Sequence, residues 1–462
     1  MFKKITKEDI NKLIDIFGGN FVFSENIEEE YAKDEMGTII SYPEVRVVAQ
    51  DKHQISKLMI FANEENIPVT VRGSGTGLVG GSVPVHGGIL LDLSKMNKII
   101  ELDKTNLTLT VEPGLMLLDI YDHVQKEGLF YAPDPGEKTA TIGGNISTNA
   151  GGMRAIKYGV TRDWIRGLEV VLPTGEIIQT GGKVVKNSTG YPLKELFVGT
   201  EGTLGIIVGI TLKLTSLPKF SASLLVPFED TKSAITAAPE LIKRHVTPTA
   251  VEYIDQTSLS YSNEFLGKHI PHDNYNAYLL LSYDGNTQEA LDSDIEQASK
   301  ICVELGALDA YLIDTDERKS SVWTVRGAFL EAIKASTTEM DEIDVVLPRS
   351  NIAEYLDYTK EVSKQLKIRM PYFGHVGDGN LHIYFCKDAL DNQTWEQTLE
   401  KGFDLMYQKA FRLGGLVSGE HGIGFAKKKY MVDQLGDTQI NLMKGIKKIF
   451  DPKGILNPSK VV

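Results

Sequence analysis

Apolar residues near the start of the chain recur every three or four positions between Ile10 and Phe17. That spacing predicts a helix with one apolar face. Thr6 and Asp9 match the capping box that begins such a helix, and Gly18 is typical of its end. The same stretch has no continuous apolar core and no small-residue cleavage site, so we expect a helix and not a signal peptide.

The next stretch changes its period twice. VRVVAQ (45–50) and IPVTVRG (67–73) have the sequences of strands, while the apolar residues between Asp51 and Asn63 fall on one helical face. Strand, helix and strand in this order predict a β-α-β unit. The chain then becomes rich in glycine and in short β-prone runs up to Gly209, which indicates strands and hairpins with few long helices.

The pattern changes again after KLTSLPKF (213–220), where Pro218 follows a strand-like run. Longer helical segments now alternate with strand-like ones such as NAYLLLSYDG and NLHIYFCKD. A helical segment over about 395–450 is broken by GGLVSGEHGIG.

The composition of the chain limits which binding partners and which cellular compartment we expect. The chain has 462 residues, which is long for one domain, and its 42% hydrophobic and 24% charged residues are ordinary for a soluble globular protein. Its net charge of −13 argues against nucleic acid or an anionic membrane as the main partner. No window approaches the ~20 apolar residues of a membrane span. Cys302 and Cys386 form no CxxC pair and are too few for an iron–sulfur cluster, which favours thiols in a reducing cytoplasm.

Three glycine-rich clusters suggest a large polar ligand. VRGSGTGLVGGSVP (71–84) contains GxGxxG directly after a predicted strand, but the helix that a dinucleotide fingerprint requires does not follow. Backbone N–H groups of such a loop can still bind an anion. TATIGGNISTNAGG (139–152) and FVGTEGTLGIIVGITLKL (197–214) complete the set. Together the three clusters predict a ligand with many polar atoms, including phosphates.

Two further motifs carry candidate metal ligands. GHVGDGNLH contains His375 and His382, and we expect its glycines to form a loop that runs into the strand LHIYF. Alone, this motif is equally compatible with a polar turn. SGEHGIG adds Glu420 and His421. Two histidines and a carboxylate form a workable set for a divalent metal, with positions left for water or substrate.

VRGSGTG, PDPG, TIGGNISTNAGG and GTEGTLGII, in this order, resemble the FAD-binding domain of the vanillyl-alcohol oxidase superfamily. From about residue 40 to the end the chain resembles the FAD-linked D-2-hydroxy-acid dehydrogenases, which include D-lactate dehydrogenases, the flavin subunit of glycolate oxidase and D-2-hydroxyglutarate dehydrogenases. The resemblance implies a two-subdomain FAD-binding domain at 1–218 and an α+β cap domain for the substrate, with an antiparallel sheet, at 219–410. A C-terminal helical segment at 411–462 would return to the flavin.

The same resemblance implies where FAD binds. The loop at 72–77 would hold the pyrophosphate, 133–136 and 141–151 would line the flavin, and 201–207 would reach the adenosine. Thr76 stands where some relatives attach the flavin through a histidine, so we expect non-covalent FAD. The residues expected to contact the cofactor are Arg72, Gly73, Ser74, Gly75, Thr76, Gly77, Pro133, Asp134, Thr141, Gly143, Gly144, Asn145, Ser147, Asn149, Gly151, Glu201, Gly202, Ile207 and Asn457.

For the catalytic site, the resemblance implies His375, His382 and Glu420 as ligands of zinc, manganese or iron. Asn380 would bind the substrate and His421 would act as the base. Oxidation of a 2-hydroxy acid removes the hydroxyl proton and transfers a hydride from Cα to flavin N5. A divalent cation polarises the hydroxyl and orients the substrate, and an imidazole titrates close to neutral pH, which suits a base.

The substrate carboxylate calls for an arginine, which pairs with it through two N–H groups. WTVRGAF offers Arg326, which matches the arginine of the family's cap domain, and Arg349 is a second candidate. In the 2-hydroxyglutarate branch a lysine is expected near the position of Glu342, so a second cation is not evident here. We therefore expect a small monocarboxylic substrate such as D-lactate, with glycolate and D-2-hydroxyglutarate as alternatives within the family.

Two other classes of function remain open. A metal-dependent hydrolase could use the two histidines and the glutamate on bound water, but the glycine clusters would then have no purpose. A flavin electron carrier without a substrate would not need the histidines. In a dehydrogenase the electrons must leave a chain without iron–sulfur ligands. We expect a partner protein in the cytoplasm, such as an electron-transferring flavoprotein or an iron–sulfur subunit.

Overall fold

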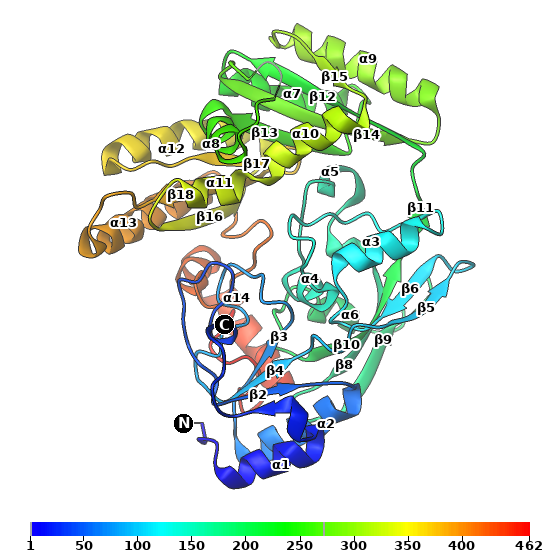
Figure 1. Ribbon diagram of the computed structural model, residues 1–462, viewed down its shortest axis with the longest axis vertical. Helices are drawn as coiled ribbons and strands as arrows, with labels where there is room; N and C mark the ends of the chain where they lie inside the picture. The colour runs from blue at the N-terminus through cyan, green and yellow to red at the C-terminus, as the bar shows by residue number, and fades with distance from the viewer. Residues whose placement is uncertain (1, 271–272) are drawn as a thin grey trace. The chain divides into compact units, whose positions relative to one another are not determined.

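The computed structural model describes residues 2–270 and 273–462, which form two compact units (Figure 1). The first unit contains Met1–Ala150, Val160–Leu217 and His421–Val462, and the second contains Gly151–Gly159 and Pro218–Glu420. Neither unit is one continuous stretch of sequence, since the chain passes between them four times. Among the described residues, no helix combines the length and the apolar sequence needed to cross a membrane.

The β-α-β unit predicted near the start of the chain is present in the first unit. Helix α1 (Lys7–Phe17) has the expected capping box of Thr6 and Asp9, and α2 (Lys52–Glu65) follows β2. The strands are β1 (Val22–Phe23), β2 (Val45–Val48), β3 (Val69–Arg72) and β4 (Ile89–Asp92). Their order is β1-β2-β4-β3, with β2 and β3 both parallel to β4. The apolar faces of α1 and α2 and the inner residues of these strands form one hydrophobic core.

A second sheet of the first unit is antiparallel, in the order β5-β6-β10-β8-β9. Its strands are β5 (Ile99–Asp103), β6 (Thr108–Val111), β8 (Ile165–Val171), β9 (Ile177–Gly181) and β10 (Ile206–Lys213), with β7 (Leu129–Phe130) and β11 (Thr215–Ser216) paired beside it. The helices are α3 (Leu117–Gln125), α4 (Ile142–Thr148), α6 (Leu193–Phe197) and α14 (Lys428–Phe450), which bends at Gly436. The predicted strands and hairpins with few long helices are confirmed for this stretch.

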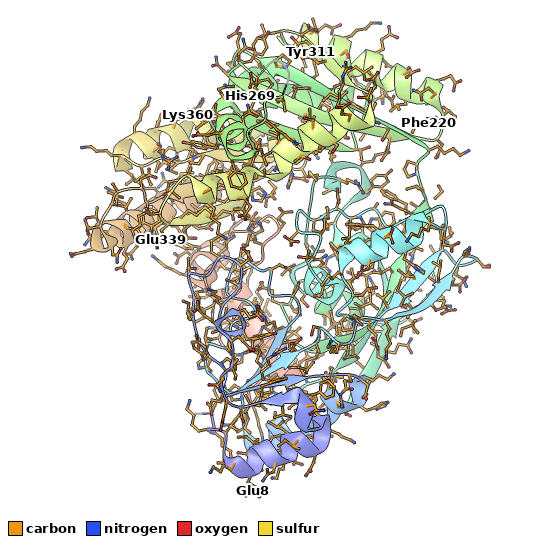
Figure 2. The ribbon with its side chains drawn as sticks, in the orientation of Figure 1. Glu8, Phe220, His269, Tyr311, Glu339 and Lys360 are labelled. Carbon is orange, nitrogen blue, oxygen red and sulfur yellow. The ribbon has the colours of Figure 1, made fainter. Side chains whose placement is uncertain are left out.

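The second unit is built on one antiparallel sheet with the order β15-β12-β14-β13-β17-β18-β16. Figure 2 marks Phe220 and Tyr311, the first residues of β12 and β15. The strands are β12 (Phe220–Phe228), β13 (Ala250–Asp255), β14 (Ala277–Gly285), β15 (Tyr311–Ile313), β16 (Met340–Val346), β17 (Tyr372–His375) and β18 (Asn380–Cys386). The helices are α5 (Ala155–Tyr158), α7 (Thr231–Lys243), α8 (Gln256–Leu266), α9 (Gln288–Glu304), α10 (Asp316–Gly327), α11 (Phe329–Ala335), α12 (Ile352–Leu366) and α13 (Asn392–Arg412).

The register of this sheet gathers polar residues on one face. Glu252 on β13 pairs with His375 on β17, and His375 pairs with Asn380 on β18. Asp344 on β16 pairs with His382 on β18. Residues directly opposite each other on antiparallel strands project to the same face, as do residues two apart on one strand. The sheet therefore places all five side chains together.

Candidate active site

Two histidines and a glutamate converge in the second unit. Nε2 of His375 lies 3.5 Å from Oε1 of Glu420, and Nε2 of His382 lies 3.2 Å from the same oxygen. The two imidazole rings are nearly perpendicular, with centroids 5.4 Å apart. The ligand atoms of all three residues lie within 4.8 Å of one another. The two motifs that the sequence analysis combined are thus brought together in space.

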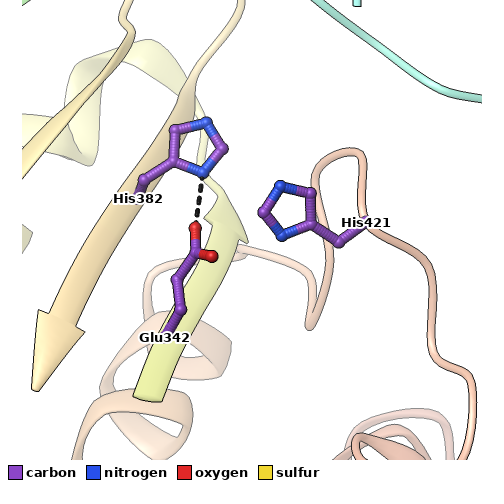
Figure 3. A group of neighbouring side chains, drawn as sticks. All are labelled: Glu342, His382 and His421. Atoms are coloured by element: carbon purple, nitrogen blue, oxygen red, sulfur yellow. Dashed lines mark hydrogen bonds and ion pairs between the residues drawn. The ribbon is translucent and has the colours of Figure 1, made fainter. Parts of the chain in front are cut away.

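A buried glutamate lies behind each histidine. Oε1 of Glu252 is 2.6 Å from Nδ1 of His375, and Oε1 of Glu342 is 2.9 Å from Nδ1 of His382 (Figure 3). A carboxylate at Nδ1 fixes the orientation and tautomer of an imidazole and leaves Nε2 free to bind a metal. Both Nε2 atoms point toward Glu420. The donor set therefore fits a divalent cation held by two imidazoles and one carboxylate.

The electrostatics of this cluster favour positive charge. Burial lowers the pKa of His375, but the charges of Glu252 and Glu420 outweigh it and hold that pKa well above the ordinary value. Burial also lowers the pKa of His382, but its hydrogen bonds with Glu342 and Glu420 raise that pKa to about 9. Burial raises the pKa of Glu420, but the two histidines hold it well below its usual range.

The hairpin that carries both histidines differs from the expected loop. His375 is the last residue of β17, Asn380 is the first residue of β18, and only four residues connect them. Gly379 has a φ of +98°, and a Cβ there would lie 2.2 Å from the carbonyl oxygen of Leu347. Asp378, at the turn, accepts a hydrogen bond from the backbone N–H of Asn380 at 3.2 Å. The glycines thus form a tight hairpin turn, and His375 is held by a strand.

The expected substrate residues are already bonded within the second unit. Nε and Nη2 of Arg326, at the end of α10, lie 2.8 and 2.5 Å from Oε2 of Glu252, and all of these groups are buried. Nδ2 of Asn380 donates to Asp344 at 2.8 Å and to the carbonyl of Val345 at 3.0 Å. Arg349 is exposed and donates to the carbonyl of Gly377 at 2.5 Å. A substrate could therefore contact Asn380 through its amide oxygen.

Glu252 and Asp344 were not singled out from the sequence. Each is an acidic residue inside an apolar strand, in AVEYID and in DEIDVV, and this is the only local signal of their role. The partners of Glu252 are distant, since His375 lies 123 positions away in the sequence. His421 follows Glu420 directly in the chain and is half-buried.

The first glycine cluster forms a loop after β3 in the first unit. Arg72 is buried, and its guanidinium donates to the carbonyls of Glu30 and Lys33 at 2.7 Å each. Gly75 has a φ of +79°, and a Cβ there would lie 2.0 Å from Nη2 of Arg72. No helix follows within residues 73–88, as the sequence indicated. Arg72 thus shapes the loop on which the exposed Ser74 and its neighbours are carried.

The second cluster forms a short helix, which the glycine content had concealed. Thr141 caps α4 by accepting a hydrogen bond from Gly144 N–H at 3.4 Å. A Cβ at Gly73 would lie 2.2 Å from Oγ1 of Thr141, so the first two clusters are in contact. Nδ2 of Asn145 is buried and has no hydrogen-bond partner among the described residues. A buried donor without a partner and a backbone with no room for side chains fit a bound polar cofactor such as FAD.

The other expected cofactor residues of this region lie in α4 or near its ends. Ser147 donates to the carbonyl of Gly143 at 2.7 Å, and Asn149 ends the helix with a φ of +53°. Pro133 and Asp134 are buried just before it. Gly151, at the end of the cluster, belongs to the second unit, where a Cβ at this position would lie 2.9 Å from Oε2 of Glu420. Gly151 of the predicted flavin motif therefore lies against a candidate metal ligand.

The third cluster is joined to the C-terminal segment. The buried carboxylate of Glu201 accepts hydrogen bonds from Ile423 N–H at 2.6 Å and Gly424 N–H at 2.8 Å, and burial raises its pKa. Asn457 donates to the carbonyls of Glu201 at 2.7 Å and Gly81 at 3.1 Å. Gly202 has a φ of +69°, and Ile207 is buried on β10. The side chains of Glu201 and Asn457 thus hold the loops together.

Lys460 completes this junction. It is buried, and its ammonium group donates to the carbonyls of Gly81 at 3.2 Å and Val83 at 2.7 Å, and to Oδ1 of Asn457 at 3.1 Å. Burial lowers the pKa of Lys460 to about 8. The first glycine loop is therefore closed by residues from the far end of the sequence.

Glycine loops in contact with one another and a buried cluster of two histidines and a glutamate define the class of a flavin-dependent oxidoreductase with a candidate metal centre. Residues 43–181 match an FAD binding domain, and residues 217–461 match the C-terminal domain of FAD linked oxidases. The chain belongs to the family of FAD-linked oxidases, and its cofactor is FAD. The resemblance stated from the four motifs is thereby confirmed.

Individual relatives are similar to this chain over its whole length. The chain is 44% identical to a D-lactate dehydrogenase of Anaerostipes hadrus, over 100% of this chain and 98% of the relative. It is 37% identical to the glycolate oxidase subunit GlcD of Bacillus subtilis, over 99% and 97%. Among solved structures, p-cresol methylhydroxylase superposes with a TM-score of 0.82 at 19% identity, covering 100% of this chain and 98% of that one. This likeness shows the vanillyl-alcohol oxidase type of fold and confirms the α+β class.

Proposed function

We propose that the protein is an FAD-dependent dehydrogenase that oxidises a D-2-hydroxy acid, with D-lactate as its substrate, to the 2-oxo acid. One observation carries the proposal: His375 and His382 converge on Glu420, and each is backed by a buried glutamate. The relatives that are D-lactate dehydrogenase and glycolate oxidase subunit GlcD support a small 2-hydroxy acid. Membership of the FAD-linked oxidases favours redox chemistry over the hydrolase considered above.

The reaction divides between the cofactors and the chain. FAD, when bound, supplies the hydride acceptor, and a divalent cation supplies the positive charge that polarises the substrate oxygens. His421 takes the hydroxyl proton, and the amide oxygen of Asn380 orients the substrate. The glutamates behind His375 and His382 keep both Nε2 atoms directed at the cation.

Recognition of the substrate carboxylate falls to Arg326. Its Nε and Nη2 atoms contact Glu252, so we assign the contact to Nη1. The variant Arg326→Lys keeps a cation beside Glu252 but lacks this nitrogen. We expect it to raise the KM for D-lactate while its metal content stays unchanged. An unchanged KM would exclude Arg326 from carboxylate binding.

The charge around the site favours a monocarboxylate. Glu342 is a buried carboxylate at the position where a second cation would be needed for a dicarboxylic substrate. Burying a second substrate carboxylate near it would be unfavourable because like charges repel at low dielectric. We therefore place D-lactate and glycolate ahead of D-2-hydroxyglutarate.

The decisive experiment is anaerobic reduction of the bound flavin by a panel of D- and L-2-hydroxy acids. We expect D-lactate to bleach the flavin absorbance, chelator treatment to prevent bleaching, and Zn²⁺, Mn²⁺ or Fe²⁺ to restore it. Bleaching that persists after the metal has been removed would exclude a catalytic metal. No bleaching by any hydroxy acid would exclude the proposed reaction.

The electrons then pass to a partner protein, for which we propose an electron-transferring flavoprotein. The net charge of −13 and the absence of a membrane-spanning helix among the described residues are compatible with a protein acceptor. Anaerobic mixing of the substrate-reduced protein with an oxidised electron-transferring flavoprotein should transfer the electrons within the time of turnover. Transfer to a quinone alone would identify a different acceptor.

A further inference from the structure

A buried carboxylate outside the proposed set of metal ligands joins the two ligand-bearing motifs. Asp344, on β16, is inaccessible to solvent. Its Oδ2 atom accepts a hydrogen bond from the hydroxyl of Ser418 at 2.7 Å and from the N–H groups of Gly419 and Glu420 at 3.1 and 3.2 Å. Its Oδ1 atom accepts one from Nδ2 of Asn380 at 2.8 Å.

These contacts account for the burial of the charge. A carboxylate removed from water is costly unless hydrogen bonds to its charged form replace its hydration. Consecutive backbone N–H groups that turn toward one anion form a nest, and residues 419 and 420 do this around Asp344. The backbone of a metal ligand is thus bound directly by this carboxylate.

The strand register makes the anchor rigid. Asp344 lies directly opposite His382 in the pairing of β16 with β18. The same strand pair therefore carries one metal ligand and the group that holds a second one. Gly419 allows the approach, since a Cβ there would lie 2.1 Å from Nδ2 of Asn380 and 2.9 Å from Oδ1 of Asp344. Only glycine fits at position 419 while these contacts are in place.

We propose that Asp344 is the positioning residue of the metal site: it fixes the backbone of Glu420 so that this carboxylate meets His375 and His382. Asp344 acts through Glu420 and does not touch the ion. The inference rests on the proposed metal site. It also makes a separate prediction, which is that Asp344 holds the loop in place even before a metal binds.

The first test is metal affinity. Asp344→Ala in the FAD-loaded, metal-stripped protein should weaken Mn²⁺ and Zn²⁺ binding by about 10- to 100-fold, the usual effect of losing a residue that orients a ligand. FAD content should not change, because the loop at 72–77, which is expected to hold the pyrophosphate, belongs to the first unit. The matched control is Ser418→Ala, which removes one of the donors but leaves both backbone bonds. We expect this control to bind metal within a few-fold of the wild type.

The second test is amide exchange in the metal-free protein. The N–H groups of Gly419 and Glu420 should exchange slowly in the wild type and fast in Asp344→Ala. If Asp344→Ala does not fold, Gly419→Ala disturbs the same contact from the loop side and should show the same loss of protection and of metal affinity.

The outcomes separate the two hypotheses. A wild type that binds no metal would refute the proposed metal site, and amide protection would still decide whether Asp344 holds the loop. Loss of protection together with loss of affinity supports the inference. Protection that survives in Asp344→Ala, or lost protection with unchanged metal affinity, overturns it.

Discussion

Glu252 and His375 form a hydrogen bond of 2.6 Å between directly opposed strand positions, while the second oxygen of Glu252 binds Arg326. One carboxylate thus holds both the histidine of the candidate metal site and the arginine proposed to bind the substrate. Both His375 and Arg326 are buried. The negative charge of Glu252 is therefore needed to balance them and to keep either one in position.

Replacing Glu252 should therefore be costly. Glu252→Gln leaves Arg326 as an unpaired buried cation, and breaking a buried pair in this way costs roughly 3–5 kcal/mol of unfolding free energy. Thermal unfolding should show a lower Tm, and titration should show weaker metal binding. Glu296→Gln, which removes a solvent-exposed pair with Lys300, is the control and should change neither. A stable Glu252→Gln protein with normal metal affinity would contradict the assigned role.

His421 should be needed for turnover but not for assembly. Loss of a general base typically costs about 10²- to 10⁴-fold in rate, so His421→Ala should reduce the flavin at least about 100-fold more slowly with D-lactate. Its FAD and metal contents should stay at the level of the wild type. His53→Ala, at an exposed position of α2, provides the control. Rapid anaerobic mixing measures both rates, and equal rates would remove His421 from the mechanism.

Two neighbouring glycines should separate loop stability from cofactor contact. Gly75 has a φ of +79°, and a Cβ there would collide with Arg72. A Cβ at Gly77 would meet nothing within 4 Å. Gly75→Ala should lower the Tm of the FAD-free protein, and Gly77→Ala should leave it unchanged. If FAD lies along this loop, Gly77→Ala should still weaken FAD binding. Unchanged FAD affinity in Gly77→Ala would place the cofactor elsewhere.

The flavin should be released when the protein is denatured, because we expect no covalent bond between flavin and protein. Thr76 has no imidazole to attach it, so acid precipitation should leave all of the flavin in the supernatant. A relative with a histidine at this position serves as the control, since its flavin should precipitate with the protein. Yellow colour retained in the washed pellet of the present protein would contradict this expectation.

Both thiols should be unreactive in the folded protein. Burial raises the pKa of Cys302 to about 12 and that of Cys386 to about 11. The reactive thiolate is therefore scarcer in the folded state than in the unfolded state at any pH below these values. Iodoacetamide at pH 8 should modify neither residue natively and both in guanidinium, as mass spectrometry would show. Native labelling of either cysteine would show that its site opens to solvent.

Local patterns predicted local structure well. Thr6 and Asp9 correctly predicted the start of α1, because a capping box is formed within four residues. No helix was predicted for TIGGNIST, yet it contains α4, in which Gly143 lies so close to Pro113 that a Cβ would not fit. Packing against distant residues overrode the low helix propensity of glycine.

The candidate metal ligands were identified from the sequence, but the residues that contact and orient them were not. His375, His382 and Glu420 belong to short motifs whose residue types suggest chemistry. Glu252 and Asp344 stand alone in apolar strands, and their meaning comes from partners that only the sheet brings close. The hydrophobic period places such residues in a strand, but the long-range contact that stabilises a buried charge leaves no mark in the local sequence.

The bonds from Asn457 and Lys460 to the carbonyl of Gly81 have a consequence for biosynthesis. The glycine-rich loop at 71–84 leaves the ribosome early. Asn457, which contacts Gly81 in this loop, is 376 positions further along the chain. These contacts therefore cannot form until the C-terminal segment has been translated. Loading of FAD should accordingly be a post-translational event, and a nascent chain arrested before residue 457 should not retain the flavin.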